Sequence, residues 1–331
     1  PHHLAVENIN ATVALKALSR DSINAQVKRL ELAEHSGFRL EGLQMHLLAN
    51  TQDMRLENFD MRLPESRLRF DVIRLQYPSA EGDSLQRDFR MDGRTKANSH
   101  LTPADIAPFV PELKHFDDAL YLSASARGDG RKWAFPSVKI NSHNDLVALQ
   151  LENVSLLIPT DTLHNNKMRV NASVDHLQVT TEGIPFLWHN LMGDEEPLPE
   201  VVQNLGHVLF NGNLEGAMDN ISTRGHLQTG IGEVKANVRL YALPDSAYAC
   251  EGHMESDSLD MMTLLGEEQK LGTVSFNLNV NGTLPTQASA ASVYLKGVFP
   301  TLQYSGYEYQ QIELDGQLDK NSFDGLLALE D

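Results

Sequence analysis

The sequence is poor in cysteine and in positive charge, and it has no long apolar run. A single cysteine, Cys250, among 331 residues permits no internal disulfide. Lysine and arginine number 27 against 45 aspartates and glutamates, and the resulting net charge of −18 argues against nucleic acid and against electrostatic attachment to an anionic membrane. No apolar stretch approaches the roughly 18 residues of a membrane-spanning helix, so the chain is not expected to span a bilayer.

Motifs for catalysis and metal binding are also scarce. The thirteen histidines are scattered, and apart from His2-His3 no two stand at metal-ligand spacing with a partnering acid or cysteine. Gly230-Ile231-Gly232 lacks the third glycine of a phosphate-binding loop and lies between two strand patterns, which favours a hairpin turn. No Gly-x-Ser-x-Gly elbow occurs. We therefore predict that the protein is not an enzyme and holds neither a metal nor another cofactor.

Alternation of apolar and polar residues dominates the last third of the chain. From Val274 to Asn281, valine, phenylalanine and leucine alternate with serine and asparagine, the period of a strand with one apolar face. Asn281-Gly282, Asp315-Gly316 and Asp324-Gly325 are typical turn sequences, so we expect hairpin turns at these dipeptides. Repetition of such units predicts one long sheet with one long apolar face.

The first half of the chain alternates too, but its phase slips by one residue at several points. The alternation over residues 23–27 is followed out of phase by Leu30, and Leu56 is followed out of phase by Phe59. A slip moves side chains to the other face of a sheet unless a bulge or a turn absorbs it. We therefore predict short strands with bulges, joined into a curved meander.

Three segments break the strand pattern and predict short helices. In the first, Thr102 stands at the cap position, Pro103 in the first turn and Asp105 close behind, as at many helix starts. Isolated helices in a β protein usually plug an end or an edge of the sheet, and the alternative is that they line the rim of a groove. They are expected from Thr102 to Leu113, from Ile184 to Met192 with a further turn over Glu200–Leu205, and from Ser258 to Gly266.

Short motifs over most of the chain resemble those of a known group, the AsmA-like proteins. Motifs in the first half resemble a pattern that recurs in large AsmA-like proteins, and motifs in the second half are similar to the TamB (translocation and assembly module) branch of that group. The first set comprises LELAEHSGFRL at 30–40, Leu56 with Asn58 and Phe59, and LPES at 63–66; the second comprises NGNLEG at 211–216, LGTV at 271–274, GYEYQQIELDG at 306–316 and FDG at 323–325.

This resemblance implies a periplasmic protein of the Gram-negative envelope, with its full-length form anchored in the inner membrane. Because the chain opens at Pro1-His2-His3 with neither a start methionine nor a leader, we expect it to be a piece of a longer protein, with any anchor outside it. The family's fold is an elongated β-sheet rolled into an open, taco-like groove with an apolar interior. The family is linked to phospholipid movement between the two membranes and to outer-membrane protein assembly, which implies an assembly protein of the Omp85 type as a partner.

The prediction is therefore an all-β protein whose elongated, curved, repetitive antiparallel sheet forms an open groove and carries a few short helices. Three regions are expected: AsmA-like β repeats over 1–100, β repeats with helical insertions over 101–206, and TamB-like groove repeats over 207–331. The residues expected to line the groove and bind lipid are Val234, Val238, Leu240, Val274, Phe276, Leu278, Val280, Val293, Leu295, Ile312 and Leu314.

The predicted function is the carriage of phospholipid acyl chains between inner and outer membranes along this groove. Acyl chains require no directional contacts and gain about 0.8 kcal/mol per buried methylene. One alternative is a periplasmic chaperone that holds strands of outer-membrane β-barrels by strand addition. Another is a β-solenoid binding module with an ordinary closed core, for which Trp133, Trp188 and the tyrosines at 304, 307 and 309 are the candidate aromatic platforms.

Overall fold

In the computed structural model, strands take up 70% of the residues and helical segments 9%. This confirms the expected all-β antiparallel fold with few short helices. By its internal contacts the chain divides into two compact units: unit 1 comprises residues 1–164 and 186–197, and unit 2 comprises residues 165–185 and 198–331. These units do not test the three regions expected from the sequence, which stay a prediction. The structure describes residues 6–77, 90–110, 113–129, 131–159, 167–193, 197–217, 219–243, 248–266, 268, 270–284, 292–319 and 322–329.

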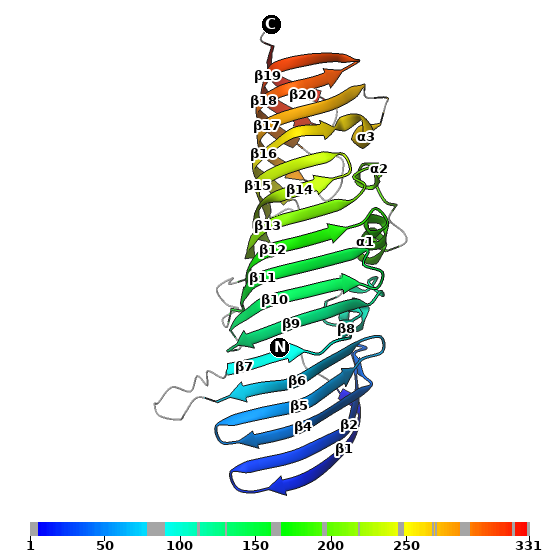
Figure 1. Cartoon of the computed structure of the whole chain (residues 1–331), viewed down its shortest axis with the longest axis vertical. Coiled ribbons are helices and arrows are strands. Elements are labelled where there is room, and N and C mark those ends of the chain that lie inside the picture. Colours follow the sequence, from blue (N-terminus) through cyan, green and yellow to red (C-terminus); the bar gives the residue numbers. More distant parts are fainter. Residues whose placement is uncertain are drawn as a thin grey trace. The chain divides into compact units, whose positions relative to one another are not determined.

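Unit 1 is an antiparallel meander in which each strand pairs with strands close to it in the sequence (Figure 1). Two short strands add to its margin, β3 beside β2, and β8 beside β6 and β9. Its strands are β1 (Val6–Leu18), β2 (Ser22–Glu34), β3 (Arg39–Leu40), β4 (Gly42–Asn50), β5 (Asp53–Arg62), β6 (Arg67–Gln76), β7 (Arg90–Thr95), β8 (His100–Leu101), β9 (Leu120–Gly128), β10 (Lys132–Ser142) and β11 (Val147–Leu157).

Unit 2 is a simpler meander, because each strand pairs antiparallel with the next one along the chain. The hairpin expected at Gly230-Ile231-Gly232 is confirmed, since Gly230 and Ile231 form the turn between β14 and β15. Its strands are β12 (Arg169–Val179), β13 (Val208–Ala217), β14 (Asn220–Thr229), β15 (Gly232–Ala242), β16 (Tyr248–Asp260), β17 (Leu271–Leu284), β18 (Ser292–Tyr304), β19 (Tyr307–Asp319) and β20 (Ser322–Leu329).

The phase slips of the first half are β-bulges, as predicted. The register of β1 against β2 shifts around Lys28, and that of β4 against β5 shifts around Asn58, which has a φ of 52°. Each extra residue restores the alternation, so the strand continues beyond it. The prediction of short strands was wrong for this reason: β2 has 13 residues and β5 has 10.

The hairpin turns expected at Asn281-Gly282, Asp315-Gly316 and Asp324-Gly325 were also wrong, because these dipeptides lie inside β17, β19 and β20. Gly316 and Gly325 stand directly opposite each other across β19 and β20. A Cβ on Gly316 would lie 2.7 Å from the Cα of Gly325, and one on Gly325 would lie 2.4 Å from the Cα of Gly316. These two glycines therefore permit a close approach of neighbouring strands, a role that a strand interior can also require.

Two of the expected helices are confirmed and two differ from the expectation. Helices α1 (Gly183–Met192) and α2 (Glu200–Gln203) lie where they were predicted. The segment after Thr102 is only one 3₁₀ turn, η1 (Pro103–Ile106), and the Thr102 hydroxyl donates to the Glu65 carbonyl (3.1 Å) instead of capping it. Helix η1 therefore ends at Ile106, and Leu113 has 3₁₀ geometry of its own.

The third helix, α3 (Met261–Leu265), begins later than predicted. Ser258 lies within β16, which continues to Asp260 because Leu259 still pairs with Val274 of β17. The cap is Asp260, whose side chain accepts a hydrogen bond from the backbone N–H of Thr263 at 3.0 Å. Gly266 ends the helix, as expected.

Helical segments are anchored at strand ends in unit 1. Ser66, in the β5–β6 turn, donates to Asp105 of η1 at 2.5 Å and accepts from the Thr102 N–H at 2.9 Å, and both Ser66 and Thr102 are buried. On α1, the fully buried Asn190 donates to the carboxylate of Asp118 at 3.1 Å. Buried polar groups satisfied in this way hold one arrangement. These hydrogen bonds attach η1 and α1 to strand ends, and whether the helices plug the sheet or line the rim of a groove stays a prediction.

Candidate functional site

All the residues predicted to line a groove lie on one face of unit 2. Leu278 stands opposite Met254 of β16 and Gly297 of β18, and residues directly opposite in an antiparallel pair share a face. Val238 of β15 stands opposite Gly252 of β16, and Gly252 stands opposite Val280 of β17, so Val238 shares this face with the residues of β17. We call this surface the apolar face. The predicted residues on it are Val234, Val238, Leu240, Val274, Phe276, Leu278, Val280, Val293, Leu295, Ile312 and Leu314.

The apolar face also covers strands in which no groove-lining residue was predicted from the sequence. In β13, Phe210 and Leu214 alternate with Gly212 and Gly216, so glycines obscure the apolar period. Following the alternation through those glycines would have found the strand, but only the register shows that it belongs to the same face. The additional residues on the face are Leu177, Phe210, Leu214, Leu227, Cys250, Met254, Leu318, Phe323, Leu327 and Leu329.

A line of β-bulges crosses unit 2 along one side of the apolar face. Register shifts fall between Val174 and Leu177 in β12, between Ser256 and Leu259 in β16, and around Pro300 in β18, at nearly equivalent positions. A bulge bends its strand, so bulges in line bend the sheet along one line, which we call the crease. Pro300 can occupy a central strand because a bulge leaves a backbone group unpaired.

Along β15 and β19, exposure of the apolar face rises with distance from the crease, whereas Leu327 and Leu329 of β20 are exposed although they stand opposite the buried Leu314 and Ile312. Val274, Leu278 and Ile312 are 3%, 7% and 4% exposed, whereas Leu240 and Leu318, farther along their strands, are 39% and 46% exposed. Side chains beside the crease are therefore packed among themselves. Those away from it form an accessible apolar surface, which is the part of the face that another molecule could contact.

The single thiol of the chain lies on this accessible part. Cys250 stands opposite Leu240 on β15 and Gly282 on β17. Burial raises the pKa of the Cys250 thiol, with a smaller contribution from the charge of Glu251. The thiol therefore stays protonated at neutral pH and acts as a small apolar side chain.

The opposite face of unit 2 carries charged residues in cross-strand pairs. Lys296 donates to Asp315 at 2.8 Å, which holds the pKa of that carboxyl below its usual value, and Arg239 donates to Glu251 at 3.2 Å. Exposed pairs of this kind contribute little to stability. They keep this face in water, so the two faces of the sheet differ sharply in polarity.

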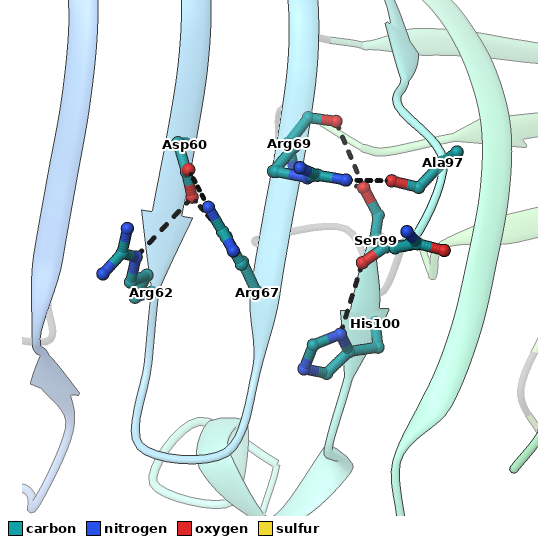
Figure 2. Close-up of polar contacts among 8 residues, drawn as sticks. Asp60, Arg62, Arg67, Arg69, Ala97, Ser99 and His100 are labelled. Carbon is teal, nitrogen blue, oxygen red and sulfur yellow. Dashed lines mark hydrogen bonds and ion pairs between the residues drawn. The ribbon is translucent and has the colours of Figure 1, made fainter.

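An arginine-rich cluster lies on β5 and β6 of unit 1 (Figure 2). The Nε of Arg67 donates to Asp60 at 2.9 Å, and this hydrogen bond holds the pKa of Asp60 below its usual value; the Nε of Arg62 lies 3.9 Å from the same carboxylate. Arg69 donates to the Ala97 carbonyl, and its buried Nε has no hydrogen-bond partner among the described residues. The cluster ties strands together and offers few free donors.

The aromatic residues weighed as binding platforms are placed differently from one another. Trp133 stands opposite Gly128, where a Cβ would lie 2.4 Å from the indole ring, so the ring covers the glycine backbone. Tyr307 is 64% exposed and contacts Tyr309 edge to face, with ring centroids 4.8 Å apart. The alternative of a β-solenoid binding module stays a prediction.

No protein-family model, curated protein or solved structure matches this chain. The resemblance to AsmA-like proteins, the envelope location and the partners implied by it therefore stay predictions. Among the described residues, no cluster of histidine, cysteine, aspartate or glutamate side chains is placed to hold a metal ion. The helices in the described part of the chain are too short or too polar to cross a membrane. The prediction that the protein is not an enzyme also stays untested.

Proposed function

We propose that the apolar face of unit 2 holds the acyl chains of phospholipids and carries them across the periplasm between the inner and outer membranes. The observation that supports this most is the exposed part of that face. Leu240, Leu318 and Phe323 are 39%, 46% and 39% exposed, and the register connects them to the buried residues beside the crease. Contiguous exposed apolar surface commonly marks a ligand or interaction site.

The chemistry of the face suits an acyl chain. Its side chains are mainly aliphatic, and none of its predicted lining residues carries a charge or a hydrogen-bonding group. An acyl chain gains about 0.8 kcal/mol for each methylene it buries and needs no directional partner, so it can slide over such a surface. The polar opposite face would remain in water throughout. The proposal therefore places lipid only on the part of the face away from the crease.

Site-specific photo-crosslinking tests this proposal. A photoreactive amino acid at Leu240, which is 39% exposed on the apolar face, should form phospholipid adducts when the protein is irradiated in Gram-negative cells. The matched control is Arg239 on the same strand, which is exposed on the opposite face and should form none. Adducts are identified by mass spectrometry after organic extraction. Equal lipid labelling at both positions, or protein contacts alone at Leu240, would contradict the proposal.

The edge strand β20 favours a second candidate function, the holding of unfolded β-barrel strands by strand addition. Among the described strands, β20 pairs only with β19, and Leu326, Leu327 and Leu329 are 65%, 54% and 53% exposed. Its backbone groups that no described strand pairs could receive a strand of another protein. A photoreactive residue at Leu326 in the same experiment separates the two functions. An outer-membrane barrel protein crosslinked there in cells, with no lipid at Leu240, would favour the chaperone.

A further inference from the structure

A hollow of about 410 Å³ lies on the polar face of unit 2, over strands β13 to β16. Its floor includes the backbone of Gly212 and Gly225, which stand directly opposite each other. Its volume falls within the range of about 300–1,000 Å³ that small-molecule pockets occupy. None of the predicted groove residues lines it, so this hollow is separate from the proposed lipid surface.

Strand register brings hydrogen-bond donors into two parallel rows around the hollow. Asn211, His226 and Lys235 stand successively opposite one another on β13, β14 and β15. Two residues farther along these strands, Arg224 and Asn237 stand opposite each other on β14 and β15. A guanidinium, an ammonium, an imidazole and two carboxamides therefore surround one small space, which the carboxylate of Glu255 also lines.

His253 of β16 extends the second row, since it stands opposite Asn237. The Nδ1 of His253 lies 3.2 Å from the side-chain oxygen of Asn279, so Nδ1 is the donor of that hydrogen bond. Its other ring nitrogen has no partner among the described residues. A second imidazole therefore borders the hollow with one nitrogen available.

The charges of these groups are only partly cancelled. Lys235 donates to Glu255 at 3.1 Å, and the Nε2 of His226 lies 2.9 Å from Glu233. Both acids therefore already engage a partner. Arg224 is exposed and has no hydrogen-bond or ion-pair partner in the described part of the chain. The guanidinium of Arg224 is thus the one full positive charge at the hollow that no carboxylate balances.

We propose that this hollow binds a small molecule through a phosphate or carboxylate group, with Arg224 as its main ligand. A guanidinium matches the planar spacing of such oxyanions and can donate two parallel hydrogen bonds to them. Lys235 and the carboxamides of Asn211 and Asn237 would donate to the remaining oxygens. The net charge of −18 opposes an anion, but salt at physiological strength screens exposed charges beyond about 8 Å, so the groups at the hollow dominate.

The proposed oxyanion site does not depend on lipid transport. The apolar face and the hollow lie on opposite faces of the same strands, because alternate residues of β15 point to opposite sides. A lipid whose chains rest on the apolar face therefore does not place its head group in the hollow. A negative result for lipid binding therefore does not contradict the oxyanion site, and a negative result for the oxyanion site does not contradict lipid binding.

Titration calorimetry of the intact chain with inorganic phosphate, and separately with acetate and glycerol 3-phosphate, tests the site. We expect saturable one-to-one binding of at least one probe, weakened about tenfold or more by Arg224→Gln because a charge-assisted hydrogen-bond pair is lost. Arg239→Gln is the matched control. It removes the same charge from the same face, at a position where the arginine already pairs with Glu251 and Asn220. Its affinity should equal that of the wild type.

Three results would overturn the oxyanion site. One is the absence of saturable binding at millimolar concentrations of all three probes. Another is an equal loss in Arg224→Gln and Arg239→Gln, which would indicate a diffuse electrostatic effect. The third is binding to phosphatidylglycerol vesicles alone, measured by sedimentation, which would indicate a lipid surface instead of a small-molecule site. Because Arg224 is exposed, circular dichroism should show the variant folded as the wild type is.

Discussion

At the scale of single residues, Asp60 shows how one carboxylate can make stability depend on pH. Its side chain is 19% exposed and accepts hydrogen bonds from Arg67 (Figure 2). These hydrogen bonds, with smaller contributions from the charges of Arg62 and Arg69, lower its pKa from the usual 3.8. A carboxyl whose pKa is lower in the folded than in the unfolded chain stabilises the fold above its unfolded pKa. That stabilisation is lost as the pH falls through the folded pKa.

We predict that Asp60→Asn lowers the free energy of unfolding at pH 7 by about 1 to 2 kcal/mol, because a partly buried, charge-assisted hydrogen bond is lost. The difference between variant and wild type should shrink as the pH falls below about 4. Urea unfolding at several pH values measures both effects. Asp92→Asn is the control, since Asp92 lies 3.9 Å from Arg74 in an exposed pair and should matter little. A difference that grows on acidification would contradict the prediction.

At the scale of strands, close approach between neighbours decides where glycine is needed. Gly316 and Gly325 lie opposite each other in β19 and β20, and the ring of Phe323 covers them: a Cβ on Gly316 would lie 2.6 Å from that ring. Aromatic cover over glycine in this manner protects a backbone that has no side chain of its own. The Asp-Gly dipeptides are therefore part of the sheet's packing.

We predict that Gly316→Ala destabilises the protein by about 1 to 3 kcal/mol, because its Cβ must displace the Phe323 ring and the backbone of β20. The control is Gly42→Ala at the start of β4, where a Cβ would meet nothing within 4 Å. That variant should be neutral or slightly stabilising, because alanine restricts the unfolded chain. Thermal unfolding compares the two. Equal stability of Gly316→Ala and wild type would show that the strands can separate at little cost.

At the scale of the whole molecule, the meander topology means that strands pair with strands close to them in the sequence. Each strand of unit 2 pairs only with its neighbours in sequence among the described strands. In architectures of this kind, stability is approximately a sum of contributions from neighbouring elements. Damage at one strand should therefore remain close to that strand.

We predict that Leu278→Ala, which removes a side chain only 7% exposed beside the crease, costs about 2 to 5 kcal/mol locally. Hydrogen exchange should quicken in β16, β17 and β18 and stay unchanged in β4 to β6 of unit 1. Leu240→Ala on the same face, at a 39% exposed position, is the control and should change exchange little. Faster exchange throughout both units would instead indicate a single cooperative structure.

The sequence by itself determined that the chain forms strands with bulges, and it determined the residues of β15, β17, β18 and β19 that were predicted to share one apolar face. Alternation is a local property, because successive side chains of a strand point to opposite sides whatever the strand pairs with. The slip at Asn58 therefore predicted a bulge, and the alternation from Val274 to Val280 predicted one apolar face. The same local signals misplaced the cap of α3 and the Asn-Gly and Asp-Gly turns, because β16, β17, β19 and β20 continue through those residues.

The tertiary structure alone decided which strands face one another, where the bulges line up and which part of the apolar face stays exposed. These are properties of register, which depends on residues far apart in the chain. Leu240 and Leu278 follow the same alternation in sequence, yet one is open and the other is packed beside the crease. Strand register likewise produces the oxyanion hollow. Asn211, Arg224 and Lys235 belong to three strands, and only the pairing of those strands brings their donors around one space.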